Sequence, residues 1–220
     1  MEHSIKQKER VKTWEEVATS NDTFRRQAKW SGMPPVTFQT HRLYNFVCRE
    51  GTKDSYQAAL DFATGKSGHH LLTFIGEPGT GKTHLVLGIG WHWLEHEMGL
   101  VKYYQAESLL DNLRQGYNIT DPETQDDFDN LLKWLKEVDL LIIDDIGTEN
   151  PTEWAVAKLN TIIDHRYLNG NLTVFTTNCS AKALARKRQQ RLASRMSEGI
   201  MQVLECDDYR HIKARLHKKG

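Results

Sequence analysis

A glycine-rich stretch at residues 76–83, GEPGTGKT, has the residue types and the spacing of a phosphate-binding loop. Glycines let backbone N–H groups curl around phosphate oxygens, and the amino end of the following helix adds a partial positive charge. Lys82 is expected to reach the β- and γ-phosphates, and the Thr83 hydroxyl is expected to bind Mg²⁺. The motif predicts that ATP and Mg²⁺ bind along Gly76, Glu77, Pro78, Gly79, Thr80, Gly81, Lys82, Thr83 and His84.

Two aspartates, Asp144 and Asp145, end an uninterrupted apolar run in VDLLIIDD. Such a run is typical of a parallel strand buried on both faces, and open α/β sheets bind their ligands at the carboxyl ends of strands. Asp144 is expected to hold Mg²⁺, directly or through water, and Asp145 to orient and deprotonate an attacking water. A structural acidic turn is the alternative for Asp145. Many ATPases carry the longer Glu there, which leaves the catalytic rate open.

A third polar residue, Asn178, closes the strand-like stretch LTVFTTN. In a strand beside those that carry the loop and the aspartates, this Asn can position the same attacking water. Alone, an Asn after a strand is an ordinary turn residue. Together with the phosphate loop and Asp144, it is interpreted as a catalytic residue.

Two arginines, Arg191 and Arg195, lie one helical turn apart in the basic stretch QQRLASRMSEG. The pair suits a solvated helix face, a patch that binds nucleic acid, or a group that reaches a nucleotide. The stretch alone does not decide between these three roles.

Strands and helices alternate along the chain, and they must position these residues. Short apolar strands are expected at 71–75, 100–105, 138–145, 172–178 and 201–205. Helices are expected at 1–30, around 54–63, from about 82 to 98, at 106–117, in the acidic stretch before Val138, and from Thr152 to a stop at Gly170. The alternation predicts an α/β fold, a three-layer P-loop NTPase built on a parallel sheet.

The composition is that of an ordinary globular domain, with 39% hydrophobic and 26% charged residues among 220. No apolar run approaches the ~20 residues that span a membrane, and the polar amino terminus resembles neither a signal peptide nor an anchor. The cysteines, Cys48, Cys179 and Cys206, lack CxxC spacing, so a reducing cytoplasm is expected.

The net charge of zero hides two stretches of opposite sign. Residues 121–149 hold ten acidic residues and two lysines, whereas residues 182–220 hold eleven Lys or Arg and four acidic residues. Two solvated faces are one interpretation. Complementary ends that suit head-to-tail assembly, or a surface for a phosphate backbone, are the other.

Seven stretches resemble, in order and spacing, the AAA+ ATPases of the DnaC/DnaI-type replicative helicase loaders. They are SGMPPVTFQT, GEPGTGKTHL, KYYQAESLLDNLRQGY, VDLLIIDDIGTENPTEW, IIDHRY, TTN and RLASRM. The IstB-type transposition helpers are near relatives of these loaders. The resemblance runs from about Phe24 to Arg210 and implies an AAA+ core without the usual C-terminal helical lid. It therefore implies ATP hydrolysis that is slow and switch-like.

The resemblance also implies a role for the two arginines. RLASR falls where AAA+ proteins carry the arginine finger, so Arg195 matches the group that stabilises charge on the ATP of a neighbouring subunit. Arg191 would support this finger or contact nucleotide or DNA. An exposed basic helix is the alternative for both residues.

In the loaders, single-stranded DNA runs along the inside of a subunit spiral. The matching positions in this sequence are Arg114, Tyr117, Thr152 and Trp154. An aromatic ring near a cation can stack a base and hold a backbone phosphate. For Trp154, an apolar anchor of its own helix is the alternative.

Residues 1–30 are expected to form a short helical segment that binds a partner, and residues 31–220 the ATPase domain. The leading hypothesis is a loader that assembles head-to-tail on single-stranded DNA with ATP and delivers a hexameric replicative helicase. The alternative is a transposition helper that forms an ATP-dependent filament on duplex DNA and recruits a transposase. A small nucleotide kinase is a third hypothesis, against which the paired aspartates, TTN and RLASR argue. The short amino-terminal segment, unlike the larger domain of most loaders, leaves the partner open.

Overall fold

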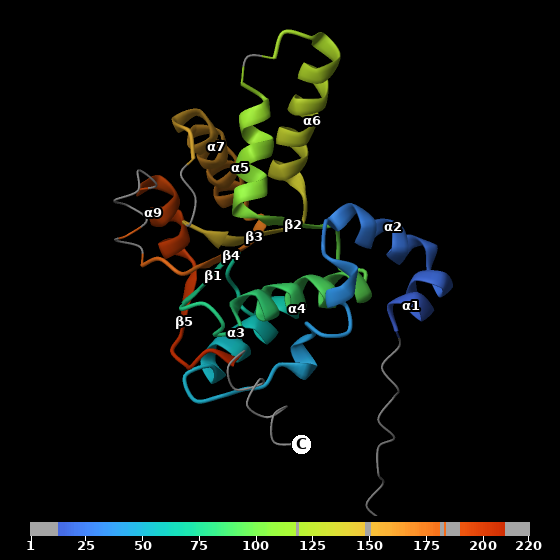
Figure 1. The fold of residues 1–220 in the computed structure, drawn as a ribbon, viewed down its shortest axis with the longest axis vertical. Helices are drawn as coiled ribbons and strands as arrows, with labels where there is room; N and C mark the ends of the chain where they lie inside the picture. Colours follow the sequence, from blue (N-terminus) through green and yellow to red (C-terminus); the bar gives the residue numbers. More distant parts are fainter. Residues whose placement is uncertain (1–12, 118, 148–150, 181–182, 184–189, 210–220) are drawn as a thin grey trace, which may run out of the picture.

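A five-stranded, all-parallel sheet forms the centre of the computed structural model, which describes residues 13–117, 119–147, 151–180, 183 and 190–209 (Figure 1). The strands lie in the order β2-β3-β4-β1-β5. Their bounds are β1 Leu71–Gly76, β2 Val101–Gln105, β3 Leu140–Ile146, β4 Leu172–Thr177 and β5 Ile200–Leu204. All strands expected from the sequence are present, and the parallel α/β fold is confirmed.

Helices cover both faces of the sheet and complete three layers (Figure 1). One face carries α1 (Trp14–Ser20), α2 (Asp22–Ser31), α3 (Lys53–Ala63) and α4 (Lys82–Glu95), with the 3₁₀ turns η1 (Pro35–Thr37) and η2 (Leu43–Asn45). The other face carries α5 (Ala106–Gln115), α6 (Pro122–Glu137), α7 (Glu153–Asn169) and α9 (Gln190–Glu198). Neighbouring residues of β3 serve both cores, since Ile142 packs with the first group of helices and Ile143 with the second. This double burial explains why the strands are uninterrupted apolar runs.

The amino-terminal segment differs from the single helix expected over residues 1–30. Residues 1–12 lie outside the described part, and Asn21 divides the remainder into α1 and α2. Its side chain accepts a hydrogen bond from the Phe24 amide at 2.9 Å, which caps α2. The Phe24 ring is buried against Phe38 and Trp91, so α2 packs onto the core that contains α4.

The long helix α7 has the ends that its sequence predicts. Thr152 caps its start by accepting a hydrogen bond from the Ala155 amide at 3.3 Å. Gly170 ends it in the left-handed conformation, at φ 70°.

Arg166 of α7 is fully buried and ties three elements together. Its guanidinium donates to the carbonyl oxygens of Leu135, Lys136, Val138 and Leu172 and to the Thr173 hydroxyl, at 2.6–3.2 Å. Burial lowers the pKa of Arg166 to about 9, so the side chain is still charged at neutral pH. These bonds join the end of α6 to α7 and to β4.

None of the helices in the described part of the chain combines the length and apolar character that crossing a bilayer requires. The expected absence of a helical lid concerns the chain after β5, of which residues 210–220 lie outside the described part.

Candidate functional site

The phosphate loop connects β1 to α4, as its sequence context predicts. Gly79 and Gly81 are left-handed, at φ 79° and 107°, and a Cβ on Gly81 would lie 2.8 Å from the Phe46 ring. Only glycine suits such a position without strain. Lys82 is nearly buried, and its ammonium donates to the carbonyl oxygens of Gly76 and Glu77 at 2.7 and 3.0 Å. The loop thus has a defined shape, with its lysine held at the loop.

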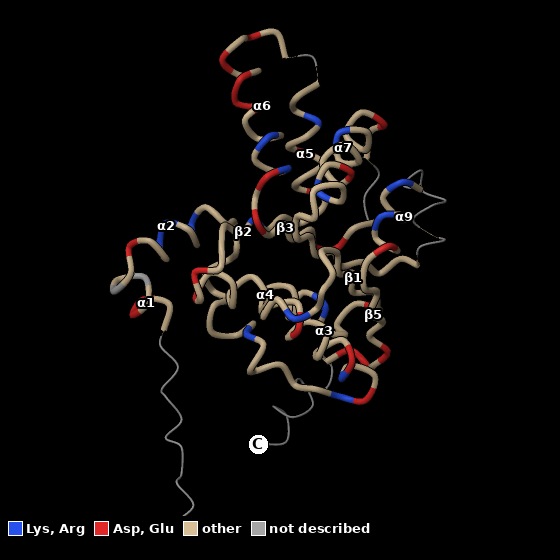
Figure 2. Tube along the Cα trace, turned by 180° about the vertical axis from the view of Figure 1, so that it is seen from behind, with Lys and Arg blue, Asp and Glu red and all other residues tan. Residues whose placement is uncertain are grey.

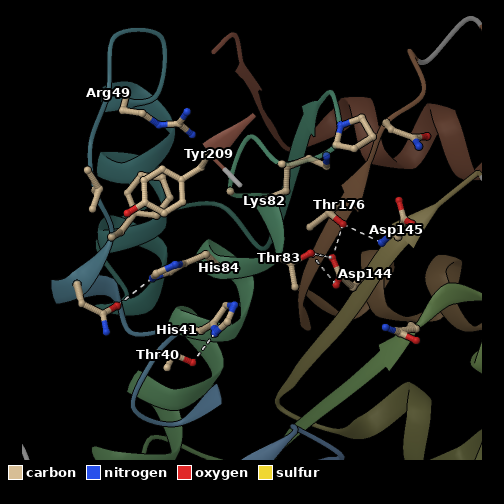
Figure 3. Close-up of a pocket in the computed structure, with 18 of the residues that line it drawn as sticks. Thr40, His41, Arg49, Lys82, Thr83, His84, Asp144, Asp145, Thr176 and Tyr209 are labelled. Atoms are coloured by element: carbon tan, nitrogen blue, oxygen red, sulfur yellow. Dashed lines mark hydrogen bonds between the residues drawn. The ribbon is translucent and has the colours of Figure 1, made fainter. Parts of the chain in front are cut away.

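Asp144, at the end of β3, is buried and accepts hydrogen bonds from three hydroxyl groups, of which those of Thr83 and Thr176 are drawn in Figure 3. Thr83 lies 3.0 and 3.2 Å from its two carboxylate oxygens. Thr176 of β4 donates at 2.5 Å, and Tyr103 of β2 at 2.9 Å. Three neighbouring elements therefore position this carboxylate.

The hydroxyl donors leave the negative charge of Asp144 in place. Burial, the charge of Asp144 and their hydrogen bond raise the pKa of Tyr103, so the phenol stays protonated. In the described part of the chain, Asp144 forms no ion pair. Thr83 and Asp144 bring a hydroxyl and a carboxylate together, and oxygen ligands of this kind suit Mg²⁺. The two residues fit the predicted metal site.

Asp145 and Asn178 lie beside this carboxylate and line the same cavity. The β3–β4 register shifts between Ile143 and Ile146, and Asp145 adopts a left-handed backbone, φ 62°, that is uncommon outside glycine. Its amide donates to the Thr176 hydroxyl at 2.7 Å, while its side chain is exposed. The structure thus brings both predicted water-positioning residues to the mouth of the site. Their catalytic roles stay predictions.

The cavity at the loop has a volume of about 780 Å³ and extends beyond the predicted residues. Of the predicted phosphate-loop residues, Gly76, Glu77 and Thr80 are not among the described residues that line it. The wall opposite the aspartates comes from residues 39–49, for which no site role is predicted, and from the chain after β5. This wall comprises Gln39, Thr40, His41, Asn45, Phe46, Val47, Arg49 and Tyr209.

His84 joins this wall to α4. Its Nε2 lies 2.9 Å from the Arg42 carbonyl oxygen and 3.0 Å from the Asn45 side-chain oxygen. The His84 ring also contacts the rings of His41 and Phe46. Burial lowers the pKa of His84, although the hydrogen bond to Arg42 opposes this shift. His84 therefore lines the cavity as a neutral imidazole at neutral pH.

Arg49 brings a further cation to the cavity (Figure 3). Its guanidinium donates to the Thr80 carbonyl oxygen at 3.2 Å and to the Asp207 carbonyl oxygen, and it lies over the Tyr209 ring. These contacts tie the chain after β5 to the phosphate loop. Arg49 is not predictable from the sequence, because no motif marks a cation that is remote in sequence from the loop it contacts.

The two arginines of α9 lie on the opposite face of the sheet from α4, against α7. Arg195 donates to Asp164 at 2.9 Å and to Glu198 at 2.7 Å, and its guanidinium lies 4.3 Å from the centre of the Tyr167 ring. Arg191 contacts the other oxygen of Asp164 at 2.9 Å. Neither arginine is among the described residues that line the cavity.

The sequence of this domain matches a known family of ATPases. The model of the bacterial DnaA ATPase domain matches residues 38–203, which include the phosphate loop, Asp144, Asn178 and Arg195. The chain belongs to this ATPase family.

Individual relatives of this chain confirm the resemblance to DnaC/DnaI-type loaders. The replicative helicase loader DnaC of Buchnera aphidicola subsp. Acyrthosiphon pisum is 32% identical over 139 residues, or 62% of this chain and 55% of that protein. A crystal structure of the DnaC helicase loader has a TM-score of 0.64 at 22% identity, covering 76% of this chain and 98% of that chain. A replication initiator DnaA bound to AMPPCP and single-stranded DNA has a TM-score of 0.68 at 23% identity, covering 80% and 52%. The chain spans about half the length of the curated relative it matches.

Within this ATPase fold, the predicted DNA contacts fall into two groups. The rings of Tyr117 and Trp154 meet edge to face at 5.7 Å, and Lys158 lies 5.2 Å from the Trp154 ring. Trp154 also stacks on buried Phe128 of α6, so it anchors its helix as well. The Thr152 hydroxyl is used as the cap of α7, and exposed Arg114 pairs with Asp111 at 3.1 Å. Tyr117 is 59% exposed, so its ring is accessible to a base.

Proposed function

We propose that the protein is an ATP-dependent replicative helicase loader that assembles head-to-tail on single-stranded DNA and delivers a hexameric helicase. One observation carries the head-to-tail part: Lys82, Thr83 and Asp144 line the cavity, whereas Arg195 lies on α9, outside the cavity. An arginine so placed suits action on the ATP of a neighbouring subunit. The relatives named as helicase loaders support the partner.

Within one subunit, ATP binding rests on the loop and on the Asp144 cluster. The loop amides and Lys82 would hold the phosphates, and Thr83 and Asp144, whose side chains lie 3.0–3.2 Å apart, would hold Mg²⁺. When bound, the metal neutralises charge on the phosphate oxygens. Asp145 and Asn178 orient the attacking water from the edge of the cavity. Hydrolysis is slow, and the nucleotide acts as a switch for assembly.

The acidic helix α6 offers a surface for a basic partner. Figure 2 shows acidic residues gathered on α6, whereas the two arginines of α9 are paired with Asp164 and Glu198 in their own subunit. Arg195 from α9 of one subunit reaches the cavity of the next, where it stabilises charge that develops on the γ-phosphate. Successive contacts of this kind give a spiral, because a head-to-tail interface need not close on itself. The helices α1 and α2 hold the helicase.

Sedimentation of the full chain with and without ATP tests the assembly. Large species are expected only with ATP and a single-stranded oligonucleotide, and Lys82→Ala should abolish them because the ammonium no longer holds the phosphates. ATP-dependent species that require duplex DNA would instead support the transposition helper. Capture of partners from native cells then separates a helicase from a transposase.

The exposed ring of Tyr117 provides a test of the single-strand path. Tyr117→Ala should weaken single-strand affinity roughly tenfold, because a base loses its stacking partner. Tyr117→Phe keeps the ring and should bind normally. Both affinities must be measured at one salt concentration, since phosphate contacts depend strongly on salt. Equal affinity of Tyr117→Ala and the unchanged protein would exclude this path.

A further inference from the structure

Asp164 of α7 is shared between the two arginines of α9. One of its oxygens lies 2.9 Å from Nε of Arg195, and the other lies 2.9 Å from Nε of Arg191. The Asp164 side chain is only 16% exposed, whereas Arg191 is 68% exposed. One largely buried carboxylate therefore holds two cations, each through its own oxygen.

Arg195 is engaged inside its own subunit. Besides Asp164, it pairs with Glu198 at 2.7 Å and covers the face of the Tyr167 ring. Hydrogen bonding to Asp164 is the largest cause that raises the pKa of Arg195. To reach the ATP of a neighbour, its guanidinium must leave this carboxylate. Its departure would leave a largely buried charge without a partner, unless another cation stays behind.

Arg191 is that second cation. We infer that Arg191 is a positioning residue that keeps Asp164 paired while Arg195 extends to the neighbouring subunit. The inference rests on the proposed function of Arg195 as a finger that acts in trans. The separate oxygens are the structural basis, since the departure of Arg195 leaves the bond between Arg191 and Asp164 intact.

This arrangement gives Arg191 a role different from the DNA contact that the sequence suggests. A cation already paired with Asp164 presents less free charge to a phosphate backbone. Its place one turn before Arg195 puts both guanidinium groups on the same face of α9, as i, i+4 neighbours. The spacing in RLASR thus serves the shared carboxylate.

A mixture of two inactive variants isolates the step. Acceptor subunits carry Arg195→Ala, so they bind ATP but offer no finger. Donor subunits carry Lys82→Ala, so they offer Arg195 but do not hold ATP. ATP turnover of a fixed amount of acceptor is measured against increasing donor, up to saturation. Further substitutions are then made in the donor alone.

Arg191→Ala in the donor should lower the saturating turnover roughly fivefold, because Arg195 must then abandon an unpaired Asp164. Arg191→Lys keeps the charge and should restore most of the turnover. Asp164→Asn, added to Arg191→Ala, should also restore the turnover. An amide at residue 164 has no charge that would be left unpaired when Arg195 moves away. Rescue by this second change is not expected if Arg191 acts on ATP, on DNA or only on folding.

Two outcomes would overturn the inference: a donor with Arg191→Ala that stimulates as well as the parent donor, or a double variant that stays as low as Arg191→Ala. Failure of the proposed function looks different. If a donor that carries both Lys82→Ala and Arg195→Ala stimulates like the parent donor, Arg195 is no finger in trans. Melting temperatures of all donors identify any variant that fails to fold.

Discussion

Two carboxylates of this ATPase domain are held in opposite ways. Asp144 is 2% exposed and accepts hydrogen bonds from neutral hydroxyl groups of Thr83, Tyr103 and Thr176. Asp164 is paired with two arginines. Neutral donors fix the position of a carboxylate but leave its charge, whereas cations cancel it. The first arrangement suits the binding of a positively charged ligand. The second suits a carboxylate that holds an arginine within its own subunit.

Arg166 is the cationic counterpart of Asp144. Its charge is enclosed by carbonyl oxygens and one hydroxyl, and it is fully buried and does not line the cavity at the phosphate loop. It lies two residues after Asp164 on α7, but it faces the core, whereas Asp164 faces α9. A charge held by neutral groups therefore marks a ligand site only where a cavity opens beside it.

The largest effect is expected from Asp144→Asn. It keeps the shape of the side chain but removes the charge that holds the metal, so ATP turnover should fall by about a hundredfold or more. Asp164→Asn is the matched control, because the same chemical change should leave ATP binding by an isolated subunit unaltered. Turnover and nucleotide titration measure both. If Asp144→Asn kept normal ATP turnover, Asp144 would not hold the metal, and the proposed difference in role between Asp144 and Asp164 would be wrong.

Arg166→Met should destabilise the fold by about 3 kcal/mol, because it leaves buried carbonyl oxygens without donors. For a domain of this size, the melting temperature should fall by roughly 6–12 °C. Arg195→Met should change it far less, because Asp164 keeps its ion pair with Arg191. Thermal unfolding compares the two variants, and equal losses would contradict the distinction between enclosed and paired charges.

Thr176→Val should have an intermediate effect on turnover. It removes the 2.5 Å hydrogen bond to Asp144 and leaves the Asp145 amide without its 2.7 Å acceptor. The loss should be roughly tenfold, with a higher Mg²⁺ concentration needed for half-maximal rate. Tyr103→Phe, which removes one donor and strands no amide, should cost less. A normal Mg²⁺ requirement in Thr176→Val would mean that hydroxyl donors do not position Asp144.

The smallest effect concerns pH and the His84 side of the cavity. Burial lowers the pKa of His84, so the folded protein resists protonation that the unfolded chain accepts. The contribution of His84 to the free energy of unfolding is fully present above the pKa of the unfolded chain, and it is lost as the pH falls from there through the pKa of the folded state. His84→Gln should therefore flatten the decline in melting temperature between roughly pH 7.5 and roughly pH 5.5. His92, whose pKa burial also lowers, should leave part of that decline in place. An unchanged slope in His84→Gln would contradict the assignment.

Local patterns predicted several of the residues that line the cavity, although their roles stay predictions. The loop, Asp144, Asp145 and Asn178 are each coded by a few adjacent residues at strand ends, and a parallel sheet brings such ends together without further information. The stop of α7 at Gly170 was predictable for the same reason, since one left-handed residue ends a helix.

Contacts between distant segments were not predictable in this way. Tyr103 looks like an ordinary strand residue, and only the pairing of β2 with β3 directs its hydroxyl to Asp144. The ion pairs of Arg191 and Arg195 with Asp164 depend on how α7 and α9 pack. The sequence motifs do not predict this packing. The division at Asn21 was missed because a helix-favouring composition hides a single capping residue.

The aromatic cluster at the amino terminus has a mechanical consequence. Trp91 belongs to the helix that starts at the phosphate loop, and it touches Trp14 of α1 and Phe24 of α2. The helix α4 therefore has the phosphate loop at its start and contacts the amino-terminal helices near its end. Linkage is reciprocal. If a partner that binds α1 or α2 moves α4 and so changes the affinity for ATP, then ATP changes the affinity for that partner by the same factor. Trp14 and Trp91 are natural fluorophores at the joint, where such coupling is measured as a shift in emission.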